Sequence, residues 1–335
     1  MVELDDEDLT QLKGIGPKAA EKLRSKDIFR QSQVALLSPT FLAEVLGVTR
    51  VKARDIINEA KNRLLEVALQ SKTAKEVKEY MDKVVKRIPT GSIALDKILG
   101  GGVPTSAITM FFGTFASGKT QICHQLVVSC KKYLGRAVAW ISTEAMTFIP
   151  DRILQIAEAQ GVEIDLEKDI PIVLTPDIVY NTQRQKLAYE LIQKRIEKGL
   201  DIGLIVIDSF NARFRSEYVG REVLTPRSGE MSAHLGQLQF LASKYNLAVV
   251  LTGQVMGIPD ASGQLDAKKR YAIDHALVGG TVLQHSCTFL VALDRVSAAD
   301  KTWKAITVDI PGPRDEAMFR IDELGVRDIS KRGKI

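Results

Sequence analysis

The sequence has little of what metal sites and disulfide bonds need. Its 335 residues include three cysteines and four histidines. No two cysteines stand in a Cys-x-x-Cys pair, and the histidines have no metal-ligand spacing relative to them, so a zinc site is not expected. An odd number of cysteines without paired spacing is typical of a reduced, intracellular protein. These residues are Cys123, Cys130 and Cys287, with His124, His234, His275 and His285.

Long apolar runs and a basic leader are also missing. No stretch of about 18 apolar residues occurs, which argues against a membrane span. The first eight residues carry five acidic side chains and no base, whereas secretory and mitochondrial leaders are basic. Hydrophobic content of 45% and charged content of 26% are ordinary for a globular chain. Together these features predict a cytoplasmic protein.

Positive charge is concentrated behind this acidic start. The formal net charge of +5 is too small by itself to indicate a nucleic-acid partner. Residues 9–66, however, contain 11 Lys and Arg against 6 Asp and Glu, and residues 67–88 contain 6 against 3. A basic segment of this kind favours contact with a polyanion such as DNA.

Residues 1–66 form the first of three expected parts and contain an internal repeat. GIGPKAAEKL at residues 14–23 aligns with GVTRVKARDI at residues 47–56, and each copy leads from a tight turn into an amphipathic helix. The pattern resembles the helix-hairpin-helix module, which binds the DNA backbone without reading bases. Its glycines allow the tight turn and leave helix amides available for a phosphate. The residues expected at this DNA contact are Lys13, Gly14, Gly16 and Lys18.

Two other interpretations of the repeat stay open. The glycines can serve only as helix caps in a packing unit, and modules of this kind also dock other proteins. In the second copy Thr49 stands where the first has Gly16, which makes the second copy less suited to hold phosphate. Residues 67–88 lack Gly and Pro and are rich in lysine, so we expect a helical or extended connector that ends at Pro89.

The remaining residues, 89–335, alternate strand-like apolar runs with helical patterns. Continuous apolar strands separated by helices predict an α/β domain with a mostly parallel sheet that is covered on both faces. The expected strands are residues 107–113, 137–143, 202–209, 247–254 and 287–294.

The stretch GTFASGKTQ, residues 113–121, follows the first of these strands and precedes a helix. Its Gly-x-x-x-x-Gly-Lys-Thr spacing is that of a phosphate-binding loop, in which amides cradle phosphates, the lysine reaches the outer phosphates and the threonine ligates Mg²⁺. Asp208 closes an apolar run and is expected in the Mg²⁺ shell, and Glu144 is expected to activate water. The loop residues expected to contact ATP are Gly113, Ser117, Gly118, Lys119, Thr120 and Gln121.

In this order the segments resemble the archaeal RadA recombinases of the RecA family along nearly the whole chain. The resemblance rests on TGSIALDKILGGGVP, FFGTFASGKTQICHQL, STEAMTFIPDRI and IVIDSFNARFRSEYVGRE, together with GQVM and VGGTVLQHS. It implies a RecA-like P-loop ATPase core after a small all-α helix-hairpin-helix domain. It also implies a filament or ring whose subunits bind single- and double-stranded DNA, hold ATP with Mg²⁺ at their interfaces and promote strand exchange in DNA repair.

The resemblance implies roles for individual residues. Gln254 would sense the outer phosphate, relay its presence to the second DNA loop, and act with Lys119 and Glu144 in catalysis. Further ATP contacts would come from an arginine stacked on the adenine and from a cap supplied by the neighbouring subunit, namely Arg152, then Asp309 and Pro311. The residues implied for contact with DNA are Arg215, Tyr218, Arg221, Arg227, Lys268, Lys269 and Arg270.

The sequence departs from the family pattern at the nucleotide loop, the first DNA loop and the subunit contact. Thr114 and Ala116 stand where the family has glutamate and glycine, and Ser142 replaces an aspartate. The first DNA loop reads RSGEMS at residues 227–232, with one base fewer and an added acid. Ser71 replaces a phenylalanine that fills a pocket on the next subunit, a change expected to cost about 2–4 kcal/mol per interface.

Three functions stay open from the sequence. The first is a recombinase that forms a filament on single-stranded DNA and exchanges strands with DNA-stimulated ATP hydrolysis. The second is a RadA paralogue that binds ATP and DNA and assists another recombinase, with weak hydrolysis, which Ser71 favours. The third is a RecA-fold ATPase of signalling or helicase type, against which the front module and the DNA-loop segment argue.

Overall fold

The computed structural model describes residues 8–68, 73–220, 222–256, 276–277, 280–312 and 314–329. The chain divides into two compact units, Met1–Tyr80 and Met81–Ile335. No described helix is both long and apolar enough to cross a membrane.

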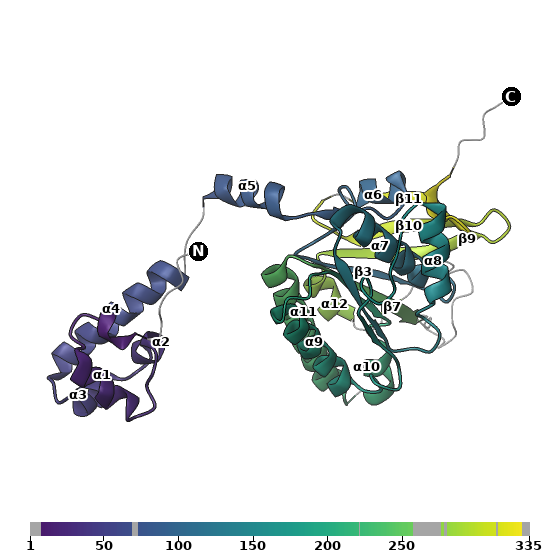
Figure 1. Cartoon of the computed structure of the whole chain (residues 1–335). Helices are drawn as coiled ribbons and strands as arrows, with labels where there is room; N and C mark the ends of the chain where they lie inside the picture. Colours follow the sequence, from purple (N-terminus) through teal and green to yellow (C-terminus); the bar gives the residue numbers. More distant parts are fainter. Residues whose placement is uncertain are drawn as a thin grey trace. The chain divides into compact units, whose positions relative to one another are not determined.

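The first unit packs short helices around a small apolar core (Figure 1). Both repeat glycines adopt positive φ angles, 102° at Gly14 and 70° at Gly47, where a side chain would be strained. Ala20 and Ala53, which occupy the same position in the two copies, are both buried in the core. The elements are η1 (Leu9–Gln11), α1 (Pro17–Arg24), α2 (Gln31–Ala35), α3 (Pro39–Leu46) and α4 (Arg50–Ala68). Helix α5 (Ala74–Val84) spans the boundary between the units.

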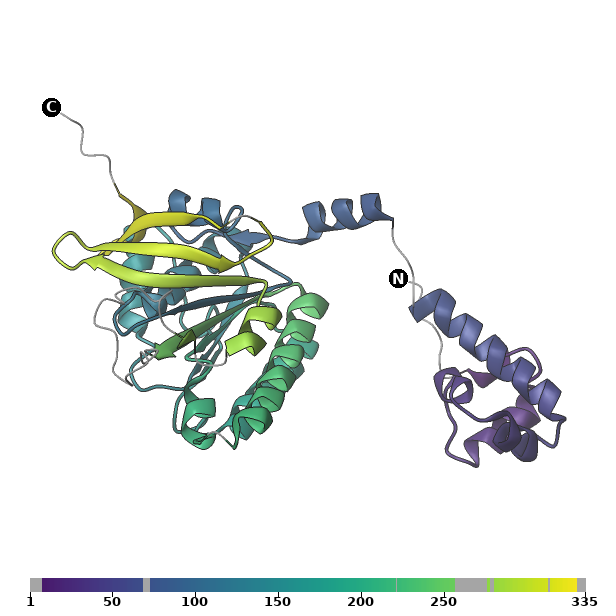
Figure 2. The same ribbon diagram turned by 180° about the vertical axis from the view of Figure 1, so that it is seen from behind.

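In the described residues, the second unit contains a ten-stranded sheet in the order β12-β11-β10-β9-β3-β7-β6-β4-β5, with β8 paired to β7. The strands from β9 to β5 in this order pair in parallel, whereas β9 to β12 form an antiparallel extension, drawn in yellow in Figure 2. A separate small sheet pairs β1 (Arg87–Ile88) with β2 (Val103–Pro104). The strands of the large sheet are β3 (Ile108–Gly113), β4 (Ala137–Ser142), β5 (Ile172–Leu174), β6 (Ile202–Asp208), β7 (Ala248–Met256), β8 (Ala276–Leu277), β9 (Phe289–Ser297), β10 (Thr302–Asp309), β11 (Glu316–Asp322) and β12 (Gly325–Asp328).

Helices cover both faces of this sheet (Figure 1). Successive strand residues point to opposite faces, so Phe111 packs in the cluster with α7 and α8, and Phe112 packs in the cluster with α9 and α11. Burial on both faces explains why the strands are continuous apolar runs. The helices are α6 (Ile93–Ile98), α7 (Lys119–Leu134), α8 (Pro150–Ala159), α9 (Thr182–Glu197), α10 (Ala212–Glu217), α11 (Leu224–Tyr245) and α12 (Gly280–Ser286).

The architecture confirms the predicted α/β core with a mostly parallel sheet and the small helical domain that precedes it. Because the central strands are parallel, their carboxyl ends lie along one edge of the sheet. Ligand sites of open α/β sheets lie at this edge.

Candidate functional site

The expected catalytic residues meet at the carboxyl ends of four neighbouring strands. Gly113 of β3 lies opposite Gln254 of β7, and Ser142 of β4 lies opposite Asp208 of β6. Glu144 follows β4 directly after Thr143. A cavity of about 570 Å³ lies at this edge. It is lined by residues 115–121, residues 144–147, Asp208, Ser209, Gln254, Arg295 and Trp303.

The loop between β3 and α7 has the backbone shape that a phosphate needs. Gly113 has no room for a side chain, because a Cβ there would lie 2.2 Å from the Leu293 carbonyl oxygen. Gly118, with φ 90°, caps α7 without a side-chain hydrogen bond. The first amides of this 16-residue helix therefore remain for a ligand, and the helix dipole adds positive potential there.

Ala116 occupies a position where the backbone is left-handed. Its φ of 60° lies in a region that costs a residue with a Cβ about 1–2 kcal/mol. Its carbonyl oxygen accepts a long hydrogen bond, 3.5 Å, from Trp303 Nε1. The loop keeps its shape with the alanine in place, and the strain falls on this one residue.

We expect Ala116→Gly to raise the free energy of unfolding by up to about 1 kcal/mol, because relief of left-handed strain exceeds the flexibility that glycine adds to the unfolded chain. Ala116→Val should lower it, because β-branched residues tolerate positive φ poorly. Ala145 lines the same cavity without a positive φ, so Ala145→Gly is the control and should not stabilise. Urea unfolding followed by tryptophan fluorescence measures the difference, and a less stable Ala116→Gly protein would contradict the strain.

Lys119 is folded back onto the loop that it belongs to. Its Nζ donates to the carbonyl oxygens of Gly113 at 3.0 Å and Thr114 at 2.7 Å, and to Ser117 Oγ at 3.1 Å. Burial lowers the pKa of Lys119, and the carboxylates of Asp208 and Glu144 act in the opposite direction. An ammonium group held by neutral oxygens at the cavity wall is ready to exchange them for phosphate oxygens, which are stronger acceptors.

Asp208 is buried and accepts hydrogen bonds from two threonines. Thr120 Oγ1 donates to its Oδ2 at 2.7 Å, and the Thr252 hydroxyl donates to its Oδ1. Burial raises the pKa of Asp208, and the two hydroxyl donors act in the opposite direction. A hydroxyl beside a carboxylate fits Mg²⁺, which takes one or two protein oxygens and completes its shell with phosphates and water. Among the described residues, no group of three or more His, Cys, Asp or Glu could hold a metal ion.

Glu144 is linked to the expected DNA segment through Gln254. Gln254 Nε2 donates to Glu144 Oε1 at 2.9 Å, and Gln254 Oε1 accepts from Arg215 Nη1 at 2.6 Å. Glu144 is half-buried and lies well before α8 begins at Pro150, so it does not serve as an acidic helix start. The carboxylate therefore borders the cavity with one N–H donor on it.

Thr143 fixes the segment that carries Glu144 to β6. Its amide donates to the Asp208 carbonyl oxygen at 2.9 Å, and its hydroxyl donates to the Ser209 carbonyl oxygen at 2.5 Å. Ser142 accepts a hydrogen bond from Trp140 Nε1 at 3.1 Å. Thr143 therefore ties the segment that carries Glu144 to the end of the strand that carries Asp208.

Arg152 is held beside the first turn of α7. Its Nε donates to Gln121 Oε1 at 2.8 Å, and its guanidinium also donates to the carbonyl oxygens of Asp322 at 2.5 Å and Glu323 at 3.0 Å. Gln121 lines the cavity, whereas Arg152 does not. These hydrogen bonds fix the orientation of the guanidinium group beside α7.

Asp309 and Pro311 do not line the cavity of their own chain. Trp303, at the start of the same strand, does line it. A strand rises about 3.3 Å per residue, so the six residues from Trp303 to Asp309 span about 20 Å. Asp309 therefore lies far along β10 from the cavity that Trp303 lines.

Two cavity residues, Arg295 and Trp303, were not expected from the sequence. The Arg295 guanidinium lies 5.4 Å from the centroid of the Trp303 ring. Trp303 also lies 3.2 Å from where a Cβ on Gly118 would be, so it covers the phosphate loop. Their strands, β9 and β10, reach the loop through long-range pairing, for which the sequence has no local signal. The rim beside them exposes Phe115 (96%) and Met146 (85%).

The residues implied for DNA contact have different surroundings. Arg215 is exposed on α10, whereas Tyr218 ends that helix and packs against the core beside Phe214. Arg227 lies in the first turns of α11, and the expected loop at residues 227–232 is wrong because this segment is helical. A proline in the first turn, Pro226, starts a helix without losing a hydrogen bond. Outside the described residues lie Ser71, Arg221, Lys268, Lys269, Arg270 and the acidic residues before Asp8.

The two hairpins of the first unit differ at the helix start. Gly16 caps α1 without a side-chain hydrogen bond, and Lys13 and Lys18 are exposed beside it. In the second copy Thr49 Oγ1 accepts from the Lys52 amide at 3.3 Å. The first hairpin therefore leaves its amides to a ligand, and the second occupies one with its own hydroxyl.

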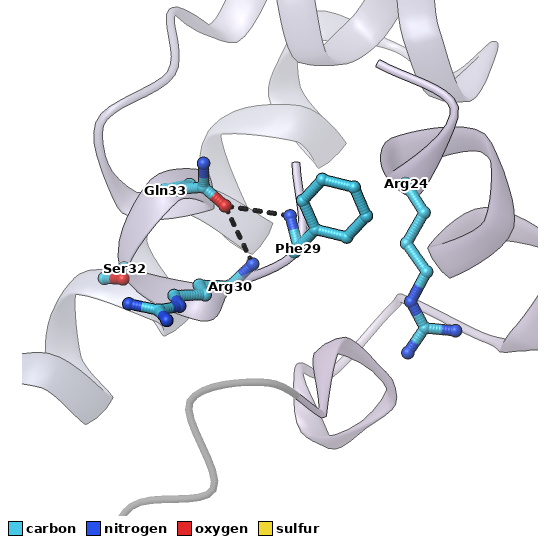
Figure 3. Close-up of a pocket in the computed structure, with 5 residues that line it drawn as sticks. All are labelled: Arg24, Phe29, Arg30, Ser32 and Gln33. Atoms are coloured by element: carbon cyan, nitrogen blue, oxygen red, sulfur yellow. Dashed lines mark hydrogen bonds between the residues drawn. The ribbon is translucent and has the colours of Figure 1, made fainter. Parts of the chain in front are cut away.

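The first unit also has a basic hollow of about 610 Å³, lined by Arg24, Phe29, Arg30, Ser32 and Gln33. Figure 3 shows the Phe29 ring between the side chain of Arg24 and those of Arg30 and Gln33. Gln33 Oε1 accepts from the amides of Phe29 at 2.8 Å and Arg30 at 3.0 Å, which fixes the turn. Phe29 is 49% exposed. An exposed ring among arginines is typical of single-strand binding surfaces, but the sequence alone does not show this exposure.

Comparison with known families agrees with this geometry. Residues 81–329 match the Rad51 family, and residues 6–62 match the family described as a SAM-like helix-hairpin-helix tandem. Rad51-family proteins are recombinase-type DNA-dependent ATPases that use ATP with Mg²⁺ and form oligomers. The match covers most of the chain, including the phosphate loop, Glu144, Asp208 and Gln254. The chain therefore belongs to the Rad51 family.

Proposed function

We propose that this chain is a recombinase of the archaeal RadA type, which binds single-stranded DNA as an oligomer and promotes homologous pairing and strand exchange in DNA repair. The observation that carries the proposal is the convergence of Lys119, Thr120, Asp208 and Glu144 on one cavity. Under this proposal, residues 89–335 form the ATPase core and residues 67–88 form the connector. Residues 1–66 form a domain that captures DNA.

The cavity supports hydrolysis of the outer phosphate of ATP. The amides of α7 and Lys119 hold the phosphates, and Glu144 accepts a proton from the water that attacks the γ-phosphorus. The bond from the γ-phosphorus to the bridging oxygen breaks, leaving ADP and inorganic phosphate. Mg²⁺, held by Thr120 and Asp208, would neutralise the charge on the phosphate oxygens.

DNA and a second chain complete the proposed assembly. Arg215 on α10 and the first hairpin, with Lys13 and Lys18, supply basic groups for the phosphate backbone. The basic hollow around Phe29 adds a surface for unpaired bases in the same unit. Asp309 and Pro311, neither of which lines the cavity of its own chain, cap the ATP of the next subunit.

The decisive experiment combines strand exchange with electron microscopy. The protein with ATP, Mg²⁺ and single-stranded DNA should form helical filaments, hydrolyse ATP faster than without DNA, and yield joint molecules with homologous duplex. Filaments and joint molecules both absent under conditions where ATP binds would refute a strand-exchange function.

One sequence feature favours a second function, that of a RadA paralogue assisting another recombinase. Ser71 offers no aromatic anchor for the next subunit. On this alternative the protein binds ATP and DNA as rings or single particles, hydrolyses ATP slowly, and stimulates strand exchange only when another recombinase is present. The same microscopy and joint-molecule assay separate the two functions.

The first hairpin should contribute a measurable share of duplex DNA binding. The Lys13→Ala/Lys18→Ala protein should lose about two phosphate contacts, so the slope of log affinity against log salt should become shallower by about 2. The matched control, Arg50→Ala/Lys52→Ala, removes equal charge beside the hairpin that Thr49 caps and should change the slope less. Fluorescence anisotropy across a salt series measures both. Equal changes in the two proteins would contradict a role for the uncapped helix start.

A further inference from the structure

Gln254 is held at both ends of its amide. Arg215 only donates hydrogen bonds, so its contact with Gln254 fixes the amide oxygen toward α10. The amide nitrogen consequently faces Glu144 and donates to it. An amide bonded in this way on both sides does not turn freely, and its direction depends on where the Arg215 guanidinium lies.

The contact with Gln254 holds Glu144 as well. To activate water, Glu144 needs a carboxylate oxygen free to accept a proton. One of its two oxygens, Oε1, already accepts the Gln254 N–H at 2.9 Å. Both groups border the same cavity, so this hydrogen bond ties one carboxylate oxygen to β7 and restricts how the carboxylate can turn within the cavity.

Arg215 is placed to respond to a polyanion. It lies on α10, which follows β6 and Asp208 closely along the chain (Figure 1). Its side chain is exposed, and in the part of the chain that the structure describes it forms no ion pair. Its hydrogen-bond partner is a neutral amide, whereas a DNA phosphate offers two charged oxygens to the guanidinium fork. A phosphate that reaches Arg215 therefore outcompetes Gln254.

We propose that Arg215 is a positioning residue that restrains hydrolysis through Gln254 until a DNA phosphate draws its guanidinium away. Without DNA, Arg215 holds Gln254, and Gln254 holds Glu144. With DNA, the Gln254 amide is released to turn toward the outer phosphate of ATP, and Glu144 is released to accept the proton of the attacking water. The inference rests on the proposed function and adds to it a restraint by Arg215 that DNA removes.

The test compares steady-state hydrolysis by Arg215 variants with and without an oligothymidylate strand. Arg215→Ala should hydrolyse ATP about tenfold faster than wild type without DNA, because one charge-assisted hydrogen bond is lost, and DNA should stimulate it little further. Arg215→Lys keeps a donor for Gln254 and a charge for phosphate, so it should retain most of the wild-type stimulation. Arg184→Ala, which removes another exposed arginine from α9, should match wild type.

A double-mutant cycle separates positioning from a general structural effect. Since Arg215 acts through Gln254, adding Arg215→Ala to Gln254→Ala should change the DNA-free rate by less than twofold. An Arg215→Ala protein that is slow or unchanged without DNA overturns the restraint. If DNA does not change the rate of ATP hydrolysis by the wild-type protein, the proposed function and the release of Arg215 by DNA are both overturned. The rates measured without DNA still test whether Arg215 restrains hydrolysis.

Discussion

The Glu144→Gln protein is expected to bind ATP with nearly wild-type affinity and to hydrolyse it about 10²–10⁴-fold more slowly. Glutamine has the size of glutamate and still offers an oxygen to Gln254 Nε2, so the hydrogen bond at 2.9 Å and the cavity wall should persist. What it lacks is a base for the attacking water. The effect should therefore fall on kcat.

Single-turnover hydrolysis and equilibrium binding of a fluorescent ATP analogue separate the two quantities. Glu158→Gln makes the same change on the exposed face of α8, and this control should keep full activity. A Glu144→Gln protein with kcat within threefold of wild type would show that another group activates the water. An equal loss of ATP affinity would show instead that Glu144 acts in binding.

The second large effect is expected from Asp208→Asn, which should reduce Mg²⁺-dependent hydrolysis about 10²–10³-fold, as losing one preorganised electrostatic group does in other enzymes. The thermal stability of the Asp208→Asn protein, in contrast, should not fall. Burial raises the pKa of Asp208, so the fold disfavours its charged form, and a neutral amide removes that cost. Without metal or nucleotide, Asp208→Asn should melt at or above the wild-type temperature.

Hydrolysis across a Mg²⁺ series and melting by differential scanning fluorimetry give the two measurements. Thr252→Val is the companion variant, since it removes one hydrogen bond to the carboxylate and leaves the charge in place. It should lose far less activity than Asp208→Asn. A clearly lower melting temperature for Asp208→Asn would mean that the carboxylate supports the fold, and the activity loss would then not report on the metal.

Sequence patterns predicted the sheet because its strands are buried on both faces and read as unbroken apolar runs. The phosphate loop could also be predicted from the sequence, because its residues are contiguous between β3 and α7. Contacts between distant strands left no such signal. Trp303 and Arg295 reach the loop only through the pairing of β9 with β3 and β10, and the bond between Arg215 and Gln254 joins residues far apart in sequence.

Residue types alone also could not predict the local backbone conformation at two places. Whether Ala116 carries strain depends on its φ, which the structure gives as 60°. Residues 227–232 contain Ser and Gly, which favour loops, yet they continue a helix because α11 packs its apolar residues, such as Met231 and Leu235, into the core. Burial of one face outweighed a modest propensity cost.

Strand β10 has a mechanical consequence for the proposed oligomer. From Thr302 to Ile306 it pairs with both β9 and β11, so this part moves with the sheet, whereas its end at Asp309 pairs with β9 alone, beyond a register shift. Trp303 at its start lies over the phosphate loop, and Asp309 at its end would, in the proposed oligomer, meet the nucleotide of the next subunit. In the proposed oligomer, β10 would therefore connect two ATP sites. A displacement at one of these sites would then be passed along the strand to the other, so we expect hydrolysis to spread between neighbouring subunits rather than occur independently along the assembly.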